Sequence, residues 1–248
     1  MQYFNVAPLA RPVRTLDPTR RGLVKSDPEL HEQAAGLDSC AMSDALDRRG
    51  LPGAVAGIGP VAAARRIAGR AITVQLRTAG PVAPARHLCT AAIEAGGPGS
   101  VIVVQHPGGK AAGWGGLLSV AATVRGIEGV VVDGPVRDVG EAASLGFPVF
   151  ARSVTPVTAR GRLAEADWNV PVVIDGCTVT PGDLVLADGS GVVFVPADRA
   201  AEITAVAAEI AAREADMAAA VRGGAAASQV MNSAYERLLG QATEDSSA

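Results

Sequence analysis

The residues best suited to chemistry lie in two short segments, Gly115-Gly116-Leu117-Leu118 and Arg137-Asp138. A helix that begins near Gly116 would leave its first backbone N–H groups open to a carboxylate or a phosphate. The planar guanidinium of Arg137 could contact a developing oxyanion, and the Asp138 carboxylate could bind a hard divalent cation. We therefore predict that the two segments form one site, with Arg137 as a catalytic and substrate-binding residue and Asp138 as the metal ligand.

Two elements would hold these segments in place. Leu117, Val120, Ala121 and Val124 recur at helical spacing, which predicts a helix from about Gly116. The run 129–132 is β-branched and bounded by glycines, so it predicts a buried strand that ends in a turn at 133–135. Arg137 and Asp138 would then follow the carboxyl end of a strand. Alternatively, the same two residues could have a purely structural role, as a surface salt bridge or a turn cap.

Composition sets the class of protein. The chain has 248 residues, 48% of them hydrophobic, with 29 glycines and only 3% aromatic residues, which is enough to bury one sizeable α/β core. The formal net charge is −3 and no run of Lys or Arg exceeds a pair, so a nucleic-acid partner is not expected. No apolar run approaches the roughly twenty residues that span a bilayer, so no membrane partner is expected either.

Cysteine usage and the N-terminal sequence indicate the compartment. Cys40, Cys89 and Cys177 are odd in number and lie outside any Cys-x-x-Cys pattern, so we expect reduced, buried thiols rather than disulfides or a zinc site. The first residues lack an apolar segment after a basic start. Both observations favour a cytoplasmic protein.

The chain divides into an N-terminal arm (1–25), a single α/β domain (26–222) and a C-terminal extension that is helical or frayed (223–248). Within the domain, a capping box predicts a helix with Ser26 as its N-cap. Further helices are expected at 40–49, 89–95 and 197–222, and strands at 71–76, 101–105, 148–150, 170–174, 184–186 and 191–195. The alternation of strands and helices predicts a partly parallel sheet.

Several segments carry a family resemblance. They are Ser43-Asp44-Ala45-Leu46, Arg137-Asp138, 146–152, Pro181-Gly182-Asp183, Ala187-Asp188-Gly189 and 191–196. Over roughly residues 37–215 the chain resembles the RraA-like superfamily, which includes the 4-hydroxy-4-methyl-2-oxoglutarate / 4-carboxy-4-hydroxy-2-oxoadipate aldolases and the regulators of ribonuclease E activity. The resemblance implies a layered α/β sandwich around a small β-barrel-like core. It also implies a ring, a homotrimer or homohexamer, with active sites between subunits.

The resemblance also implies roles for particular residues. In the aldolases, an acid, twenty residues and then Arg-Asp form the family motif. By that pattern, Asp138 would hold Mg²⁺ or Mn²⁺, Arg137 would contact the oxygen of a small 2-oxo acid, and amides of the 115–118 loop would hold its carboxylate. Glu214 would be a catalytic acid supplied by a neighbouring subunit, although an exposed helical Glu is the alternative. Trp114 would be a wall of the substrate pocket or a core residue.

One position departs from the family motif. Gly116 stands where the motif has its acid, which in the aldolases orients water on the metal. Losing such a partner costs on the order of 10–100-fold in affinity or activity. The sequence therefore predicts a pocket that is retained but altered, with a substrate of a different carbon skeleton as one expectation. The nearest replacement acid is Glu141, for which an exposed helical position is the favoured interpretation.

Two function classes remain open from the sequence. The first is a metal-dependent carbon–carbon lyase, an aldolase or decarboxylase, because a Lewis acid chelated by a 2-oxo acid stabilises the enolate formed on bond cleavage. The second is a non-catalytic oligomeric binding or regulatory protein of the ribonuclease E regulator type. Asp138 favours the lyase, because a pure adaptor would not need it, and Gly116 mildly favours the regulator.

Overall fold

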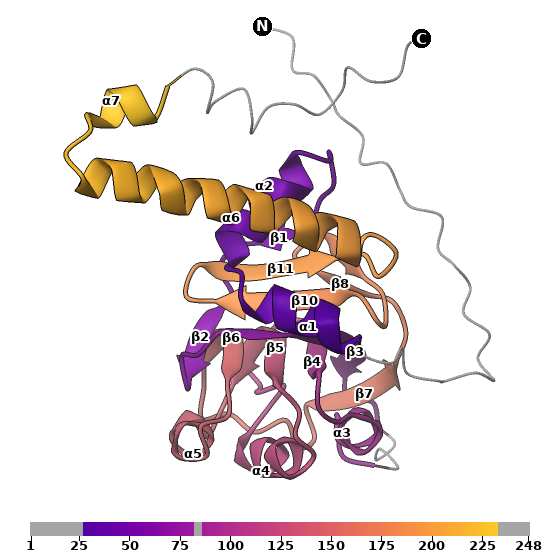
Figure 1. Ribbon diagram of the computed structural model, residues 1–248. Coiled ribbons are helices and arrows are strands. Elements are labelled where there is room, and N and C mark those ends of the chain that lie inside the picture. Colours follow the sequence, from indigo (N-terminus) through magenta and orange to yellow (C-terminus); the bar gives the residue numbers. More distant parts are fainter. Residues whose placement is uncertain (1–26, 82–85, 233–248) are drawn as a thin grey trace, which may run out of the picture.

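The computed structural model describes residues 27–81 and 86–232, and Figure 1 shows them as a large mixed sheet between two groups of helices. The predicted N-terminal arm and residues 233–248 of the predicted extension lie outside the described residues. The expected mixed α/β class, with its partly parallel sheet, is confirmed. In the described part of the chain, no helix combines the length and apolar content needed to cross a membrane.

Four parallel strands form the centre of the sheet, and antiparallel strands extend it on both sides. The parallel strands are β3 (Ile67–Thr78), β4 (Ser100–Gln105), β5 (Gly129–Val136) and β6 (Val149–Val154). Beyond β3 lie the antiparallel strands β10 (Leu184–Asp188), β11 (Gly191–Val195) and β1 (Ala54–Val55). Beyond β6 lies β2 (Gly59–Ala62), and β7 (Leu163–Trp168) pairs with the carboxyl-terminal end of β3. A separate hairpin joins β8 (Val172–Ile174) to β9 (Cys177–Val179).

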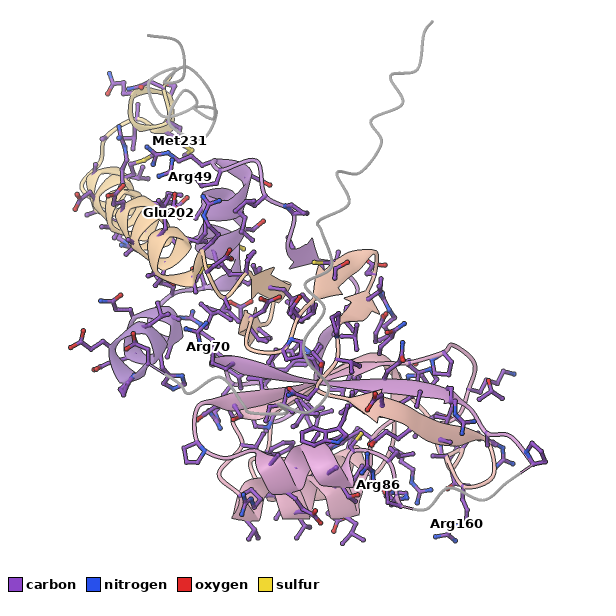
Figure 2. The ribbon with its side chains drawn as sticks, turned by 90° about the vertical axis from the view of Figure 1, so that its right-hand side faces the viewer. Arg49, Arg70, Arg86, Arg160, Glu202 and Met231 are labelled. Atoms are coloured by element: carbon purple, nitrogen blue, oxygen red, sulfur yellow. The ribbon has the colours of Figure 1, made fainter. Side chains whose placement is uncertain are left out.

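The helices lie in two groups at opposite ends of the molecule. The group below the parallel strands in Figure 1 consists of α3 (Thr90–Ala95), α4 (Gly116–Val124) and α5 (Val139–Ser144). The other group consists of α1 (Pro28–Ala35), α2 (Ser39–Asp47) and the long α6 (Ala200–Arg222), which α7 (Ala227–Val230) follows. Arg49 and Glu202 point toward each other between the end of α2 and α6 (Figure 2), with 2.8 Å between Nε and Oε1.

Period-two alternation distributes the strand residues between separate cores. On β4, Ile102 and Val104 pack toward α3 and α4, whereas Val101 and Val103 join a central cluster. The strands and the loops beside them supply the described members of that central cluster, and the β8–β9 hairpin contributes Ile174. The pairing of the described strands runs as an open path from β1 to β2, so no closed ring of strand pairs among them surrounds this core.

Several local expectations are corrected. The N-cap of α1 is Asp27, whose carboxylate accepts the N–H groups of Glu29 and Leu30, and not Ser26. The strand predicted to end in a turn at 133–135 continues to Val136 as β5, with an irregular register there that absorbs the Asp-Gly-Pro sequence. The short strands β1, β2, β7 and β9 were not predicted.

The cysteines also differ from the prediction. Cys89 is fully buried, as expected, and burial raises the pKa of its thiol well above the ordinary value. Cys177 is half-buried and Cys40 is exposed, so the expectation of three buried thiols is wrong for these two. All three are free thiols, as predicted.

Gly69 offers a test of how closely the sheet is packed. A Cβ at this position of β3 would lie 2.8 Å from the Gly99 carbonyl oxygen, which is backbone and cannot rotate away. We expect Gly69→Ala to lower the free energy of unfolding by about 1–3 kcal/mol. Gly59→Ala is the matched control, because Gly59 also lies in a strand and has open space around its Cβ position. Urea denaturation of both variants measures the difference, and equal stability would contradict the packing seen here.

Candidate active site

Backbone hydrogen bonds join the loop before α4 to the end of β5. The N–H of Gly113 donates to the Pro135 carbonyl at 2.8 Å, and the N–H of Arg137 donates to the Trp114 carbonyl at 3.0 Å. The two segments singled out in the sequence follow the parallel strands β4 and β5, whose carboxyl ends meet at one edge of the sheet. The structure therefore brings Gly115–Leu118 and Arg137-Asp138 together, as predicted.

Asp138 makes the direct contact between the segments. It immediately precedes α5 in the left-handed backbone region, with φ 57° and ψ 35°, a conformation that Asp tolerates better than most residues. Its Oδ2 accepts the N–H of Gly116 at 3.1 Å and the Nε–H of Arg137 at 3.0 Å. Glycine at position 115 permits this approach, because a Cβ there would already lie 3.2 Å from Oδ2.

These donors also fix the charge of Asp138. The N–H of Gly116 is the largest cause of the lowered pKa of the Asp138 carboxyl; burial opposes it, and the hydrogen bond and charge of Arg137 lower the pKa further. The carboxylate is therefore ionised at neutral pH. A metal ligand must be deprotonated, so Asp138 meets that requirement at neutral pH.

The start of α4 is only partly open. The amide of Gly116 is occupied by Asp138, which corrects the expectation that the first N–H groups are all free. Within the described part of the chain, the amides of Leu117 and Leu118 have no hydrogen-bond acceptor. These two donors, at the positive end of a nine-residue helix, remain suited to an anion.

The side chains around the loop have different surroundings. Leu118 is buried, and Leu117 is 79% exposed. Of the two places predicted for Trp114, its indole occupies the core: it stacks on Phe147 with 6.2 Å between ring centroids, and its N–H donates to Ser119 Oγ at 2.9 Å. The Trp114 side chain therefore anchors the loop in the core, and the Trp114 carbonyl accepts the backbone N–H of Arg137.

Glu141 lies closer to the site than the sequence indicated. It is in the first turn of α5 and is exposed, as expected for a helical Glu. However, a Cβ built on Gly116 would overlap Glu141 Oε2 and lie 2.7 Å from its Cδ. The carboxylate of Glu141 thus occupies the space in which a side chain at position 116 would begin.

The donor set at this edge suits a hard cation. No group of three or more His, Cys, Asp or Glu side chains that could hold a metal occurs among the described residues. The oxygens of Asp138 and Glu141 suit Mg²⁺ or Mn²⁺, which prefer oxygen ligands, and Mg²⁺ in particular keeps several waters. Within the described residues Asp138 Oδ1 has no hydrogen-bond donor, which leaves one oxygen for coordination.

Glu214 does not join this site within one chain. It lies on α6, near enough to Asp44 of α2 to contribute to the raised pKa of that carboxyl, whose main cause is burial. In Figure 1, α6 and the pair α4 and α5 are at opposite ends of the molecule. A catalytic role for Glu214 therefore requires a second copy of the chain and remains a prediction.

One supporting group was missed in the sequence. Glu165 of β7 accepts the N–H of Cys89 at 2.8 Å and pairs with Arg86, so it anchors the start of α3. Cys89 in turn lies beside the loop that leads to Trp114, with its Sγ 4.0 Å from the Gly113 carbonyl oxygen. The missing signal was strand β7 itself, whose Ala, Glu and Asp residues are all depleted in strands, so the segment was not predicted as one.

Comparison with known proteins gives the family. The family model described as RraA-like, Aldolase/RraA, matches residues 39–194. The chain belongs to the RraA-like family. Its fold is shared with an uncharacterised protein from Pseudomonas syringae pv. tomato, with a TM-score of 0.76 and 31% sequence identity. The matched region covers 84% of this chain and all of the Pseudomonas protein's chain. It is also shared with RraAS2 of Streptomyces coelicolor, described as an unusual member of the RNase ES inhibitor RraA protein family (TM-score 0.70, 28% identity, 78% of this chain and 97% of the other).

Two curated relatives cover much of this RraA-like chain. Protein DlpA of Legionella pneumophila is 34% identical over 194 residues, which make up 77% of this chain but only 32% of DlpA. The chain therefore spans about a third of that relative. A protein of Halalkalibacterium halodurans is 33% identical over 162 residues, 64% of this chain and 73% of the relative, and is provisionally named a 4-hydroxy-4-methyl-2-oxoglutarate aldolase.

The lowered pKa of Asp138 predicts a pH effect on stability. A carboxyl whose pKa is lowered by folding stabilises the folded state above its unfolded pKa, and this contribution is lost as the pH falls through the folded pKa. We expect the melting temperature of the wild type to exceed that of Asp138→Asn slightly near pH 6, and the gap to close below about pH 3.8. Asn has nearly the shape of Asp and tolerates the left-handed backbone, so the substitution removes the charge of the carboxylate without straining the chain. The measurement is thermal melting with EDTA present, and a gap that widens in acid would contradict the assignment.

Proposed function

We propose that this protein is a divalent-metal-dependent carbon–carbon lyase, an aldolase or decarboxylase, acting on a small anionic 2-oxo acid. The observation that carries the proposal is the contact of Arg137 and the Gly116 amide with the ionised Asp138 at the start of α4. The provisional aldolase names of several relatives support the same class of reaction.

The helix start would hold the substrate. The amides of Leu117 and Leu118 would donate to its carboxylate, helped by the positive end of the α4 dipole. Arg137 is tied to Asp138 through Nε, so its remaining N–H groups would donate to the 2-oxo oxygen. These donors are fixed before the reaction and aim at the oxygen on which negative charge develops.

Asp138 would hold the cation, Mg²⁺ or Mn²⁺, through Oδ1. When bound, such a cation supplies Lewis-acid stabilisation of the enolate that carbon–carbon cleavage produces. The hydrogen bonds to Oδ2 keep the carboxylate ionised and fix its orientation at the same time. Arg137 and Asp138 thus act as a unit in which each positions the other.

A neighbouring subunit would complete the site. The side chains of Arg137 and Asp138 are 37% and 39% exposed, whereas polar catalysis is strongest where water is excluded. Leu117 and Val124 are 79% and 81% exposed and lie seven residues apart, hence on one face of α4. A homotrimeric or homohexameric ring that covers this face would shield the site and could bring Glu214 from the next subunit.

The non-catalytic regulator loses part of its support. Gly116 was the residue that favoured it, because the motif acid is missing there. The carboxylate of Glu141 occupies that space, so an acid would remain near Asp138. The catalytic interpretation is therefore the better supported one.

Loss of Asp138 or Arg137 should remove the activity. We expect Asp138→Asn to abolish Mg²⁺- or Mn²⁺-dependent pyruvate formation from oxaloacetate or a 4-hydroxy-2-oxo acid. Arg137→Lys should reduce kcat by about 10²–10³-fold, because Lys keeps the charge but loses the planar fork. Glu94→Gln, which removes an exposed acid from α3, is the control and should match the wild type. A coupled assay of pyruvate measures the rates, and wild-type turnover that survives EDTA would contradict the metal-dependent mechanism.

Assembly provides a separate test. If α4 forms a subunit interface, light scattering at micromolar concentration should give at least three times the mass of the 25.0 kDa chain. Val124→Glu should shift the protein toward smaller species, because a charge would be buried in an apolar contact. A monomeric wild type would rule out the ring and any role of Glu214 in another subunit's site.

A further inference from the structure

A buried histidine, His106, lies against both backbone segments that lead into the candidate site. It directly follows β4 and is only 7% exposed. A Cβ on Gly113 would lie 3.1 Å from its Cδ2, and a Cβ on Gly134 would lie 2.5 Å from its Cγ. Gly113 is three residues before Gly116, where α4 begins, and Gly134 is three residues before Arg137. The two glycines therefore make room for an imidazole next to both parts of the site.

Both ring nitrogens of His106 have backbone partners in the loop after β4. The N–H of Gly108 donates to Nδ1 at 3.0 Å, and Nε2 lies 2.9 Å from the Ala111 carbonyl oxygen. Because a backbone amide can only donate, Nδ1 must be unprotonated, so the neutral ring has its proton on Nε2 and donates it to Ala111. One side chain thus closes the loop 107–111 through two hydrogen bonds.

The surroundings keep this imidazole neutral. Burial lowers the pKa of His106, and the Ala111 carbonyl and the charge of Asp133 oppose that shift only in part. Asp133, on β5, is itself paired with Arg152. At pH 7 the ring is therefore in the state in which Nδ1 can accept the Gly108 amide.

The sequence of the loop makes such closure necessary. Gly108 and Gly109 both have a φ of 90°, in the region that favours glycine, and adjacent glycines lose much conformational freedom when they become ordered. The far end of the loop is tied down by the N–H of Ala112, which donates to the Val157 carbonyl at 2.9 Å. The two hydrogen bonds of His106 offset the ordering cost of the residues before it.

We infer that His106 is a positioning residue of the site, which closes the loop 107–111 and sets the spacing between the start of α4 and Arg137 by packing against Gly113 and Gly134. The inference rests on the proposed function, since this spacing matters to a reaction only if one occurs here. His106 contacts backbone, so it acts on the substrate through the α4 amides and Arg137.

Two measurements on the full chain test this role. One is the steady-state rate of pyruvate formation, and the other is hydrogen–deuterium exchange of peptides that cover residues 106–118 and 133–141. His106→Phe keeps a ring beside the two glycines but loses both hydrogen bonds. We expect it to speed exchange in both peptides by about 5–30-fold, the effect of one or two lost hydrogen bonds. It should also lower kcat/KM by about 10–100-fold, mainly through kcat, because the reacting groups are misplaced.

Conservative variants separate the hydrogen bonds from packing. His106→Asn places an amide oxygen near the position of Nδ1, and His106→Gln places an amide nitrogen near the position of Nε2. Each keeps one hydrogen bond, so each should recover part of the protection and of the rate that His106→Phe loses. His87→Phe makes the same substitution at an exposed histidine and should match the wild type. Circular dichroism melting verifies that each variant is folded.

The outcomes separate this inference from the proposed function. If the wild type forms no pyruvate, the proposed function fails, whereas the exchange data still decide whether His106 fixes the two segments. If the wild type is active and His106→Phe exchanges and turns over as the wild type does, only the role of His106 is overturned. Faster exchange in 106–118 alone, with kcat/KM unchanged, would mean that His106 closes its own loop without positioning the site, which also overturns the inference. Equal losses in all three His106 variants, with no recovery by Asn or Gln, would indicate general packing and overturn it as well.

Discussion

The hydrogen bond from the Gly116 amide to Asp138 Oδ2 is the interaction on which the site depends. It joins the first turn of α4 to the residue that begins α5, across the carboxyl ends of β4 and β5. The same oxygen also accepts the Nε–H of Arg137, so one carboxylate oxygen fixes the Arg137 guanidinium and both backbone segments. Asp138 is held in a left-handed conformation that costs free energy for a non-glycine residue, and such strain persists only where surrounding contacts determine it.

The two adjacent glycines make that interaction possible in different ways. At Gly115 a side chain would crowd both Asp138 Oδ2 and Arg137 Cγ, each 3.2 Å from the Cβ position. At Gly116 the conflict is with Glu141 instead. Both glycines are therefore required by close approach, and neither has the positive φ that would make glycine necessary for conformational reasons. The core beneath them, where Trp114 stacks on Phe147, keeps the loop at this distance.

Much of this arrangement could be predicted from local sequence. The helical spacing from Leu117 to Val124 gave α4 its correct start, and the valines of 129–132 gave the buried part of β5. The end of β5 could not be predicted from Asp133-Gly134-Pro135, because pairing with β6 overrides the turn preference of those residues. Strand β7 was missed for the opposite reason: its Ala, Glu and Asp residues have low strand propensity, and pairing with the long β3 makes it a strand.

The position of Glu141 lay beyond local inference altogether. Three residues after Asp138, its sequence context is that of an ordinary exposed helical Glu, and it is indeed exposed. Its contact with Gly116 arises because a left-handed residue reverses the chain between β5 and α5, and no periodicity in the sequence records that reversal. A motif read along the sequence counts an acid as lost when it leaves position 116. In space, the Glu141 carboxylate reaches from α5 the volume in which a side chain at position 116 of α4 would begin.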